Sequence, residues 1–417
     1  MTPVPIIRSR TTAAAAVTAL MLVALTALPS GVWAQDLGGS CSLLDYRTLR
    51  RDPLPGTAHA IWWLGAPDLL CGDGARVRAD SAISYSESGR NQLIGNVVIR
   101  DAETELRAAE ADHYAAQGQL FARGNVAFRD LETGREMSGD TLTLLEAGSS
   151  GATDQLTLRG RPAVAFLPRE GSTVEEPAPA GAYRIAARDL RFEGERYVWG
   201  TGEVAVERES LRIFADSLAF DRQTGSLLVV GSARMEEEGT VFEGDWMQVR
   251  MRDDIVESIE IEGHGHVVNN QIELTAWTIS ITIQEEKVQR VVADRGAGSE
   301  TSDVPRLLTE EFFIVGDQLD ILSPDEVPDR VRALGRAWAQ THTTGDPLPP
   351  LDASPSERLA RDPLTPEVLA DDWIQADEID VLFSRVGPTA RPADAGQSED
   401  EYYVRQLTGS GSARTLY

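Results

Sequence analysis

The residue types best suited to catalysis or metal binding are few in this chain. There are five histidines and two cysteines among 417 residues. His264 and His266 form an H-x-H pair in an expected strand, where strand alternation would place both rings on one face. Such a pair can bind zinc only with further ligands, and no third ligand can be identified from the sequence. We therefore expect an exposed polar strand face here and no metal site.

No catalytic motif accompanies these histidines. The sequence lacks a serine-nucleophile elbow, a phosphate-binding loop, a zinc-spaced cysteine pair and a dinucleotide fingerprint. Carboxylates are abundant, but nothing distinguishes a catalytic pair from the many solvated ones. We expect no enzyme activity and no cofactor. A polysaccharide-degrading enzyme that uses exposed acids is the weakest of the hypotheses considered.

The charge of the chain restricts its partners. Asp and Glu number 66 against 39 Lys and Arg, which gives a net charge of −27 without a basic stripe. Nucleic acid is therefore a poor partner, and anionic membrane surfaces are repelled. An anionic amphiphile would have to be bound through its apolar part or through bridging divalent cations.

The aspartates themselves recur in a pattern that indicates structure. A small residue, an Asp, a variable residue and an apolar residue follow one another about nine times, and such repetition determines the architecture of a chain. The intact copies are Ala79-Asp80, Ala111-Asp112, Gly139-Asp140, Ala215-Asp216, Gly244-Asp245, Gly316-Asp317 and Ala376-Asp377, and Ala187-Arg188 and Ala276-Trp277 carry a replaced acid. We expect these aspartates to be structural, bonding to nearby backbone amides.

Each copy lies in a strand whose alternation slips by one residue. Ile213 and Ala215 alternate, and after Asp216 the apolar positions resume at Leu218 and Phe220. A slip would turn every later side chain to the wrong face unless the strand bends or bulges there. We call these the aspartate strands.

The strands between them keep their alternation and carry a glycine at one register. Leu93-x-Gly95-x-Val97-x-Ile99 is an example, and we call these the glycine strands. A repeated glycine in a strand indicates a shared kink or a close backbone approach. Nine repeats predict an all-β, elongated antiparallel fold of roughly eighteen strands or more.

The N-terminus predicts export. Arg8 and Arg10 precede an apolar run at residues 13–28, which is shorter than the ~20 residues that span a bilayer. Small residues around Ala34 suit cleavage, so residues 1–34 are expected to be a signal peptide. An uncleaved anchor is the minor alternative. In an oxidising compartment Cys41 and Cys71 are expected to pair; the alternative is two buried thiols.

The alternation of aspartate and glycine strands after a secretory signal resembles the OstA-like family. This family contains LptA/LptC-type periplasmic lipopolysaccharide-transport proteins and the N-terminal domain of LptD. The clearest match runs from Val77-Arg-Ala-Asp80 through Leu93-Ile-Gly-Asn-Val-Val-Ile99 to Gly124-Asn-Val-Ala-Phe128, and weaker copies extend it over most of residues 70–415. The resemblance implies a twisted antiparallel β-jellyroll with an apolar groove, here one long module or two in tandem.

The domain organisation that follows has four parts. After the signal peptide, residues 35–75 form an N-terminal segment with the expected disulfide. Residues 76–300 hold jellyroll repeats. Residues 301–417 hold further repeats, with a Pro-rich insertion at about 342–372. The chain is expected to stop on a strand at residues 413–417, whose edge could pair with another bridge protein of this type.

The function implied by the resemblance is a periplasmic lipid-binding or lipid-transport protein that contacts the outer or inner membrane and shields acyl chains. The alternative is a structural β-repeat protein of the envelope with no lipid ligand. Lipopolysaccharide or a similar amphiphile is the expected partner. The expected groove lining is Leu93, Val97, Ile99, Val126, Phe128, Leu142, Leu144, Leu190, Phe192, Ile213, Leu218, Phe220, Met247 and Val249.

Overall fold

The structure, a computed structural model, describes residues 41–71, 74–147, 153–168, 181–252, 255–269, 272–285, 287–296, 304–309, 312–323, 329–341, 373–385 and 402–416. Its described residues form 26 β-strands and one short 3-10 turn, η2 (Ala115–Gln117). The expected all-β class is confirmed. The chain divides into two compact units, residues 1–209 and 210–417.

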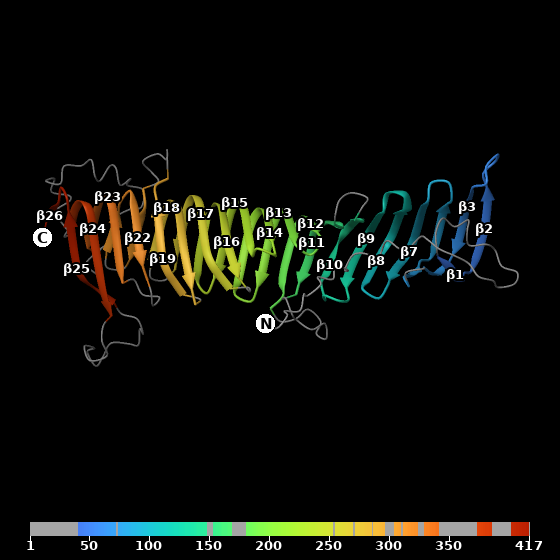
Figure 1. The fold of residues 1–417 in the computed structure, drawn as a ribbon, viewed down its shortest axis with the longest axis horizontal. Coiled ribbons are helices and arrows are strands. Elements are labelled where there is room, and N and C mark those ends of the chain that lie inside the picture. Colours follow the sequence, from blue (N-terminus) through green and yellow to red (C-terminus); the bar gives the residue numbers. More distant parts are fainter. Residues whose placement is uncertain are drawn as a thin grey trace, which may run out of the picture. The chain divides into compact units, whose positions relative to one another are not determined.

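The first unit is a ladder of antiparallel strands (Figure 1). Its strands are β1 (Ser42–Asp45), β2 (Thr48–Pro53), β3 (Ala60–Gly65), β4 (Asp68–Leu70), β5 (Arg76–Arg78), β6 (Ser81–Tyr85), β7 (Arg90–Arg100), β8 (Thr104–Tyr114), β9 (Gln119–Asp130), β10 (Glu136–Leu145), β11 (Gln155–Leu167), β12 (Tyr183–Glu193) and β13 (Tyr197–Arg208). From β7 to β13 each strand pairs with the next along the chain. Before β7, pairs of short strands replace the long ones, and β5 and β6 each pair with one half of β7.

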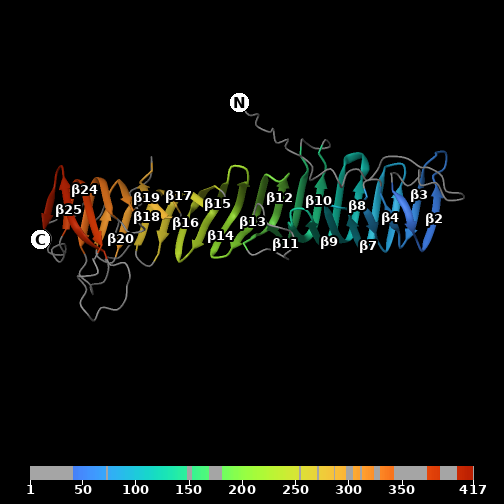
Figure 2. The ribbon, with the colours of Figure 1, turned by 60° about the horizontal axis from the view of Figure 1, so that its bottom comes forward.

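The second unit repeats this organisation, as Figure 2 shows from another side. Its strands are β14 (Leu211–Asp221), β15 (Ser226–Glu237), β16 (Thr240–Arg252), β17 (Ile255–Val268), β18 (Ile272–Gln284), β19 (Lys287–Asp294), β20 (Arg306–Thr309), β21 (Phe312–Val315), β22 (Gln318–Leu322), β23 (Arg330–Thr341), β24 (Trp373–Arg385), β25 (Tyr402–Ser410) and β26 (Arg414–Leu416). The two halves of β18 pair with β19 and β20, and the two halves of β24 pair with β25 and β26.

The long strands change direction at a shared corner, where neighbouring strands differ by one residue. In β14 and β15, Ser217 pairs with Val230 and Phe214 with Arg234, so β15 uses four steps where β14 uses three. The glycine strand therefore holds one residue more than the aspartate strand at the corner. The slip of alternation expected in the aspartate strand arises from this difference in residue number. Gly231 and Ser232 take positive φ angles of 84° and 46° there, as two successive bulge residues.

Steric contact explains why glycine recurs at this register. A Cβ added to Gly231 would lie 2.3 Å from Oδ2 and 2.7 Å from Cβ of Asp216 on the preceding strand. The same contact joins Asp80 to Gly95, Asp245 to Gly263, Asp317 to Gly335 and Asp377 to Gly411. Aspartate and glycine strands therefore fit together at the corner. This contact is the close approach that the repeated glycine indicated in the sequence.

The aspartates are structural, but side chains are their main partners. Asn96 Nδ2 donates to Asp80 Oδ2 at 2.9 Å, and Arg336 Nε donates to Asp317 Oδ2 at 3.1 Å. Only Asp377 accepts from a backbone amide beyond the corner, that of Ser412 at 3.0 Å, among the bonds that the described corners form.

One copy of the repeat lies elsewhere than expected. In β8 the residue that faces Gly124 is Ala109, so the corner lies three residues before the expected position of Asp112. Asp112 instead accepts from Arg90 at 2.8 Å. The reason is that the Ala-Ala step at residues 108–109 satisfies the steric requirement without an acid.

The N-terminal expectations have mixed outcomes. Cys41 and Cys71 are joined in a disulfide across the paired strands β1 and β4. The expected signal peptide and the Pro-rich insertion at 342–372 lie outside the described residues. The two compact units divide at 209/210, and strands on either side of residue 300 pair, as in Val291 with Ile321. The expected domain bounds remain a prediction. Among the described residues, no helix is long and apolar enough to cross a membrane.

Candidate functional site

The expected groove residues point into the two units. Twelve of them are buried: Leu93, Val97, Ile99, Val126, Phe128, Leu142, Leu190, Phe192, Ile213, Leu218, Met247 and Val249. Leu144 and Phe220 are partly exposed. The first nine in chain order belong to the first unit and the last five to the second.

In the second unit the inward side chains form continuous apolar rows across the strands. Cross-strand pairs connect Phe220, Leu227, Val249, Ile259, Ile281, Val291, Ile321, Val331, Val381 and Leu407. A parallel row connects Leu218, Val229, Met247, Ile261, Ile279, Ala293, Leu319, Ala333 and Ile379. Burying such side chains contributes about 1.5–3 kcal/mol each, so these rows hold the unit together.

Side chains from the two sides of the corner meet across the interior at two places that the structure describes. The rings of Phe312 and Phe383 lie 5.3 Å apart, although β21 and β24 place them on opposite sides of the corner. In the first unit the Arg135 guanidinium lies 5.8 Å from the ring of Phe192. A guest chain would therefore have to displace or part these contacts to reach the deeper apolar rows.

One inward row of the first unit is polar at its N-terminal end. Cross-strand pairs connect Trp62, Ser84, Asn91 and His113, and the row continues as Leu120, Leu144, Leu156, Phe192 and Val198. Trp62 Nε1, Asn91 Nδ2 and His113 Nδ1 are buried without a hydrogen-bond partner among the described residues. Sequence reasoning missed this row. Strand alternation could have identified it, because each of the four polar-row residues is two positions from a buried Leu or Ala and therefore faces the same way.

Burial lowers the pKa of His113 below its ordinary value of 6.5, because desolvation penalises the charged ring. The unfolded chain then binds more protons than the folded one in mild acid, so stability falls as pH falls below about 6.5. We expect His113→Leu to remove this component. Urea unfolding at pH 7.5 and 5.5 measures the decrease in the free energy of unfolding on acidification. This decrease should be smaller in the variant than in the unsubstituted protein, and equal decreases would contradict the prediction.

The two histidines of the H-x-H pair both lie on the outer face of β17, where they alternate with the buried Gly263, Gly265 and Val267. His264 is a bulge residue with a φ of 53°, and its ring contacts Asp245 Oδ2 at 3.2 Å and lies 5.5 Å from the Trp277 ring. His266 is in regular strand, with 29% of its side chain exposed against 70% for His264. Buried and outward positions keep alternating through the bulge, so the expected polar strand face is present and the two rings differ only in exposure and contacts.

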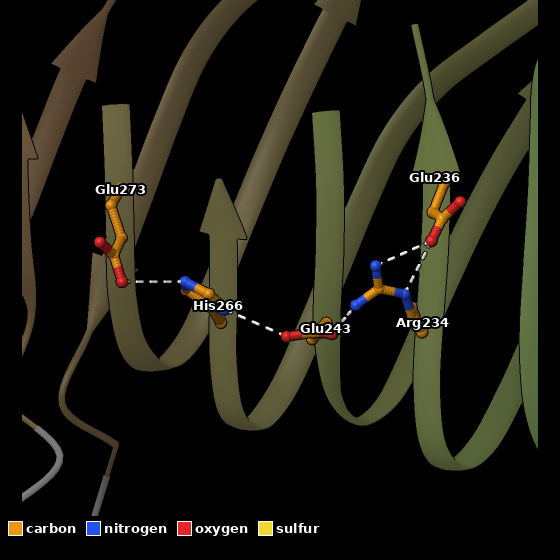
Figure 3. A network of polar contacts seen from close by, with 5 residues as sticks. All are labelled: Arg234, Glu236, Glu243, His266 and Glu273. Carbon is orange, nitrogen blue, oxygen red and sulfur yellow. Dashed lines mark hydrogen bonds and ion pairs between the residues drawn. The ribbon is translucent and has the colours of Figure 1, made fainter. Parts of the chain in front are cut away.

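His266 belongs to a polar chain over four strands, β15 to β18 (Figure 3). Its Nδ1 lies 3.1 Å from Glu243 and its Nε2 lies 3.2 Å from Glu273, while Arg234 joins Glu243 to Glu236. The hydrogen bond from His266, with that from Arg234, lowers the pKa of Glu243. Exposed pairs of this kind contribute about 0–1 kcal/mol each. They mark a solvated outer face.

No metal site accompanies this network. Across the part of the chain that the structure describes, no group of three or more His, Cys, Asp or Glu side chains is arranged to hold an ion. His266 uses its two ring nitrogens on two carboxylates on opposite sides, so it is occupied as a link between strands.

Comparison with known proteins gives matches among solved structures. No family model matches the chain, and no curated protein matches it in sequence. Among solved structures, LptH of Pseudomonas aeruginosa is similar; it is the LptA-homologous periplasmic component of the lipopolysaccharide transport device. The match is 16% identical, covers 38% of this chain and 82% of that one, and has a TM-score of 0.20. The antiparallel jellyroll-like architecture of this chain therefore rests on its own strand ladders.

Proposed function

We propose that this chain is an exported, non-enzymatic lipid-binding protein that shields acyl chains of lipopolysaccharide or a similar amphiphile inside its bent β-ladders. The observation that carries the proposal is the pair of continuous inward apolar rows in the second unit, which extend across successive strands from Phe220 to Leu407. Such rows offer an acyl chain an unbroken apolar path. Each buried CH₂ contributes about 0.8 kcal/mol, which can hold a lipid despite the acidic exterior.

The charged outer faces of the strands complement their apolar inner faces. Cross-strand ion pairs such as Arg290 with Asp320 and Arg330 with Asp380 cover the outside of the strands whose inner faces are apolar. A protein of this kind can remain dissolved while its interior takes up lipid. The sequence resemblance to the OstA-like family points to the same function.

We propose that other bridge proteins of the same type are the protein partners, through strand pairing. β25 pairs with β24 alone, and β2 pairs with β3 alone, among the described strands. Each therefore presents a backbone edge that an added strand could extend.

A matched pair of substitutions on β14 tests lipid binding. Phe220 faces inward and is partly exposed, whereas Phe214 on the same strand faces outward and is 38% exposed. We expect Phe220→Asp to weaken binding of fluorescent lipopolysaccharide at least ten-fold, because a carboxylate must be desolvated against the acyl chain. Phe214→Asp should bind like the unmodified protein.

Mass spectrometry of lipid retained after gentle purification complements this measurement. Equal binding by both variants, with both still folded, would argue against an interior lipid site. The specific alternative is a structural envelope protein with a dry core. It is favoured by the complete burial of side chains such as Met247 and Leu190, and it predicts that no lipid is retained or bound.

A further inference from the structure

The polar row of the first unit is the feature that an acyl-chain site alone does not explain. Trp62 is 4% exposed, and its indole N–H is one of three buried nitrogens in this row without a partner among the described residues. A buried donor without a partner costs about 1–3 kcal/mol. The three belong to β3, β7 and β8 and lie in one inward cross-strand row, in which Ser84 of β6 stands between Trp62 and Asn91.

Beyond His113 the same inward row is apolar. The next strands of the same row carry Leu120, Leu144 and Leu156. Polar residues therefore occupy only one end of a row that is otherwise apolar, which is the pattern of a binding site that is polar at one end and apolar along the rest.

We propose that this polar row, Trp62, Asn91 and His113, binds the acceptor-rich head or linkage group of an amphiphile whose chain lies along the adjacent leucines. The proposal rests on the proposed function and adds where the head of the lipid lies and which groups recognise it. All three nitrogens can donate a hydrogen bond, and indole and amide nitrogens can only donate. The ligand group must therefore supply oxygen acceptors, as phosphate, carbonyl and sugar groups do.

The dimensions and charge of the site fit an extended head group. Neighbouring strands are about 4.8 Å apart, so the row from Trp62 to His113 spans roughly 15 Å. Arg51, on the neighbouring β2, lies 5.5 Å from the Trp62 ring and brings a positive charge to this end. A cation there favours an anionic acceptor such as phosphate over a neutral one.

Photo-crosslinking in the full chain tests the proposal. Benzoylphenylalanine at Leu144 reports on lipid in the first unit, and at Phe220 on lipid in the second; both positions are partly exposed. The probe is lipopolysaccharide. We expect the double variant Asn91→Leu, His113→Leu to need at least ten times more lipopolysaccharide for half-maximal crosslinking at 144, since each lost donor costs about five-fold. Crosslinking at 220 should stay unchanged. Adding Trp62→Phe should increase the loss.

Stability measurements and an outward control complete the test. The same double variant should unfold at an equal or higher denaturant concentration without lipid, because it removes unpartnered donors. Trp63→Phe with Gln92→Leu, on the outward faces of β3 and β7, should change neither crosslink.

The outcomes separate this inference from the function on which it rests. Absence of crosslinks at both positions in the unsubstituted chain would overturn the proposed function. Crosslinks at both positions that the Asn91 and His113 substitutions leave unchanged would overturn only the polar-head site. Loss of apo stability with unchanged crosslinking at 144 would show that the nitrogens serve the fold, through water, and would also overturn it.

Discussion

Replacing Gly231 by alanine is expected to destabilise the second unit by about 3 kcal/mol. A positive φ costs a residue with a Cβ roughly 1–2 kcal/mol, and overpacking adds about 1–3 kcal/mol. The new Cβ would lie 2.7 Å from Asp216 Cβ, which cannot move without the backbone of β14. Hydrogen exchange across β14 to β17, with denaturant unfolding of the full chain, measures the loss.

Gly239 provides the matched control. Its φ of 84° equals that of Gly231, but a Cβ there would meet nothing within 4 Å. Gly239→Ala should cost only the backbone strain, about 1 kcal/mol. Combining Gly231→Ala with Asp216→Gly should recover the steric part. If the two single variants were equally destabilised, the aspartate would not be the reason for the glycine.

Removing the disulfide is expected to destabilise the first unit by about 3–4 kcal/mol. Cys41 and Cys71 are 30 residues apart, and closing a loop of this length restricts the unfolded chain by roughly that amount. Cys41→Ala with Cys71→Ala should therefore lower the unfolding midpoint and increase hydrogen exchange in β1 to β6. Exchange in β14 to β25 should stay the same.

Reductant serves as the control for this prediction. The unsubstituted protein in excess reductant should reach the stability of the double variant, and the double variant should not respond to reductant, since no other cysteine exists in the chain. Unchanged exchange in β1 to β6 after reduction would show that strand pairing alone holds this end of the first unit.

Local patterns predicted most of the fold. Alternation identified the strands, and the slip at Ala215-Asp216 marked the corner that the structure places there. The aspartates were expected to be structural, which the contact of Asp216 with the Gly231 position explains. The corner of β8 was misplaced because Ala109 meets the same steric requirement without an acid. A pattern built on Asp cannot detect a substitute that only has to be small.

The site was less predictable, because it depends on pairing between distant residues. Inward residues such as Val97 and Met247 follow from alternation alone. The polar row does not, since Trp62 and His113 come to lie in one row only when β3, β6, β7 and β8 pair in this register. Alternation also predicted that His264 and His266 share one polar face, and both lie on the outer face of β17. His264 has a positive φ that alternation does not foresee.

The complementarity of aspartate and glycine strands constrains how such a chain can change its length. An aspartate strand needs a glycine strand beside it at the corner, as Asp245 needs Gly263, so a single strand gained or lost would oppose two acids or two bulges. Evolution or engineering can then extend the ladder only by whole hairpins. Since strands are about 4.8 Å apart, a strand ladder lengthens in increments of roughly 10 Å.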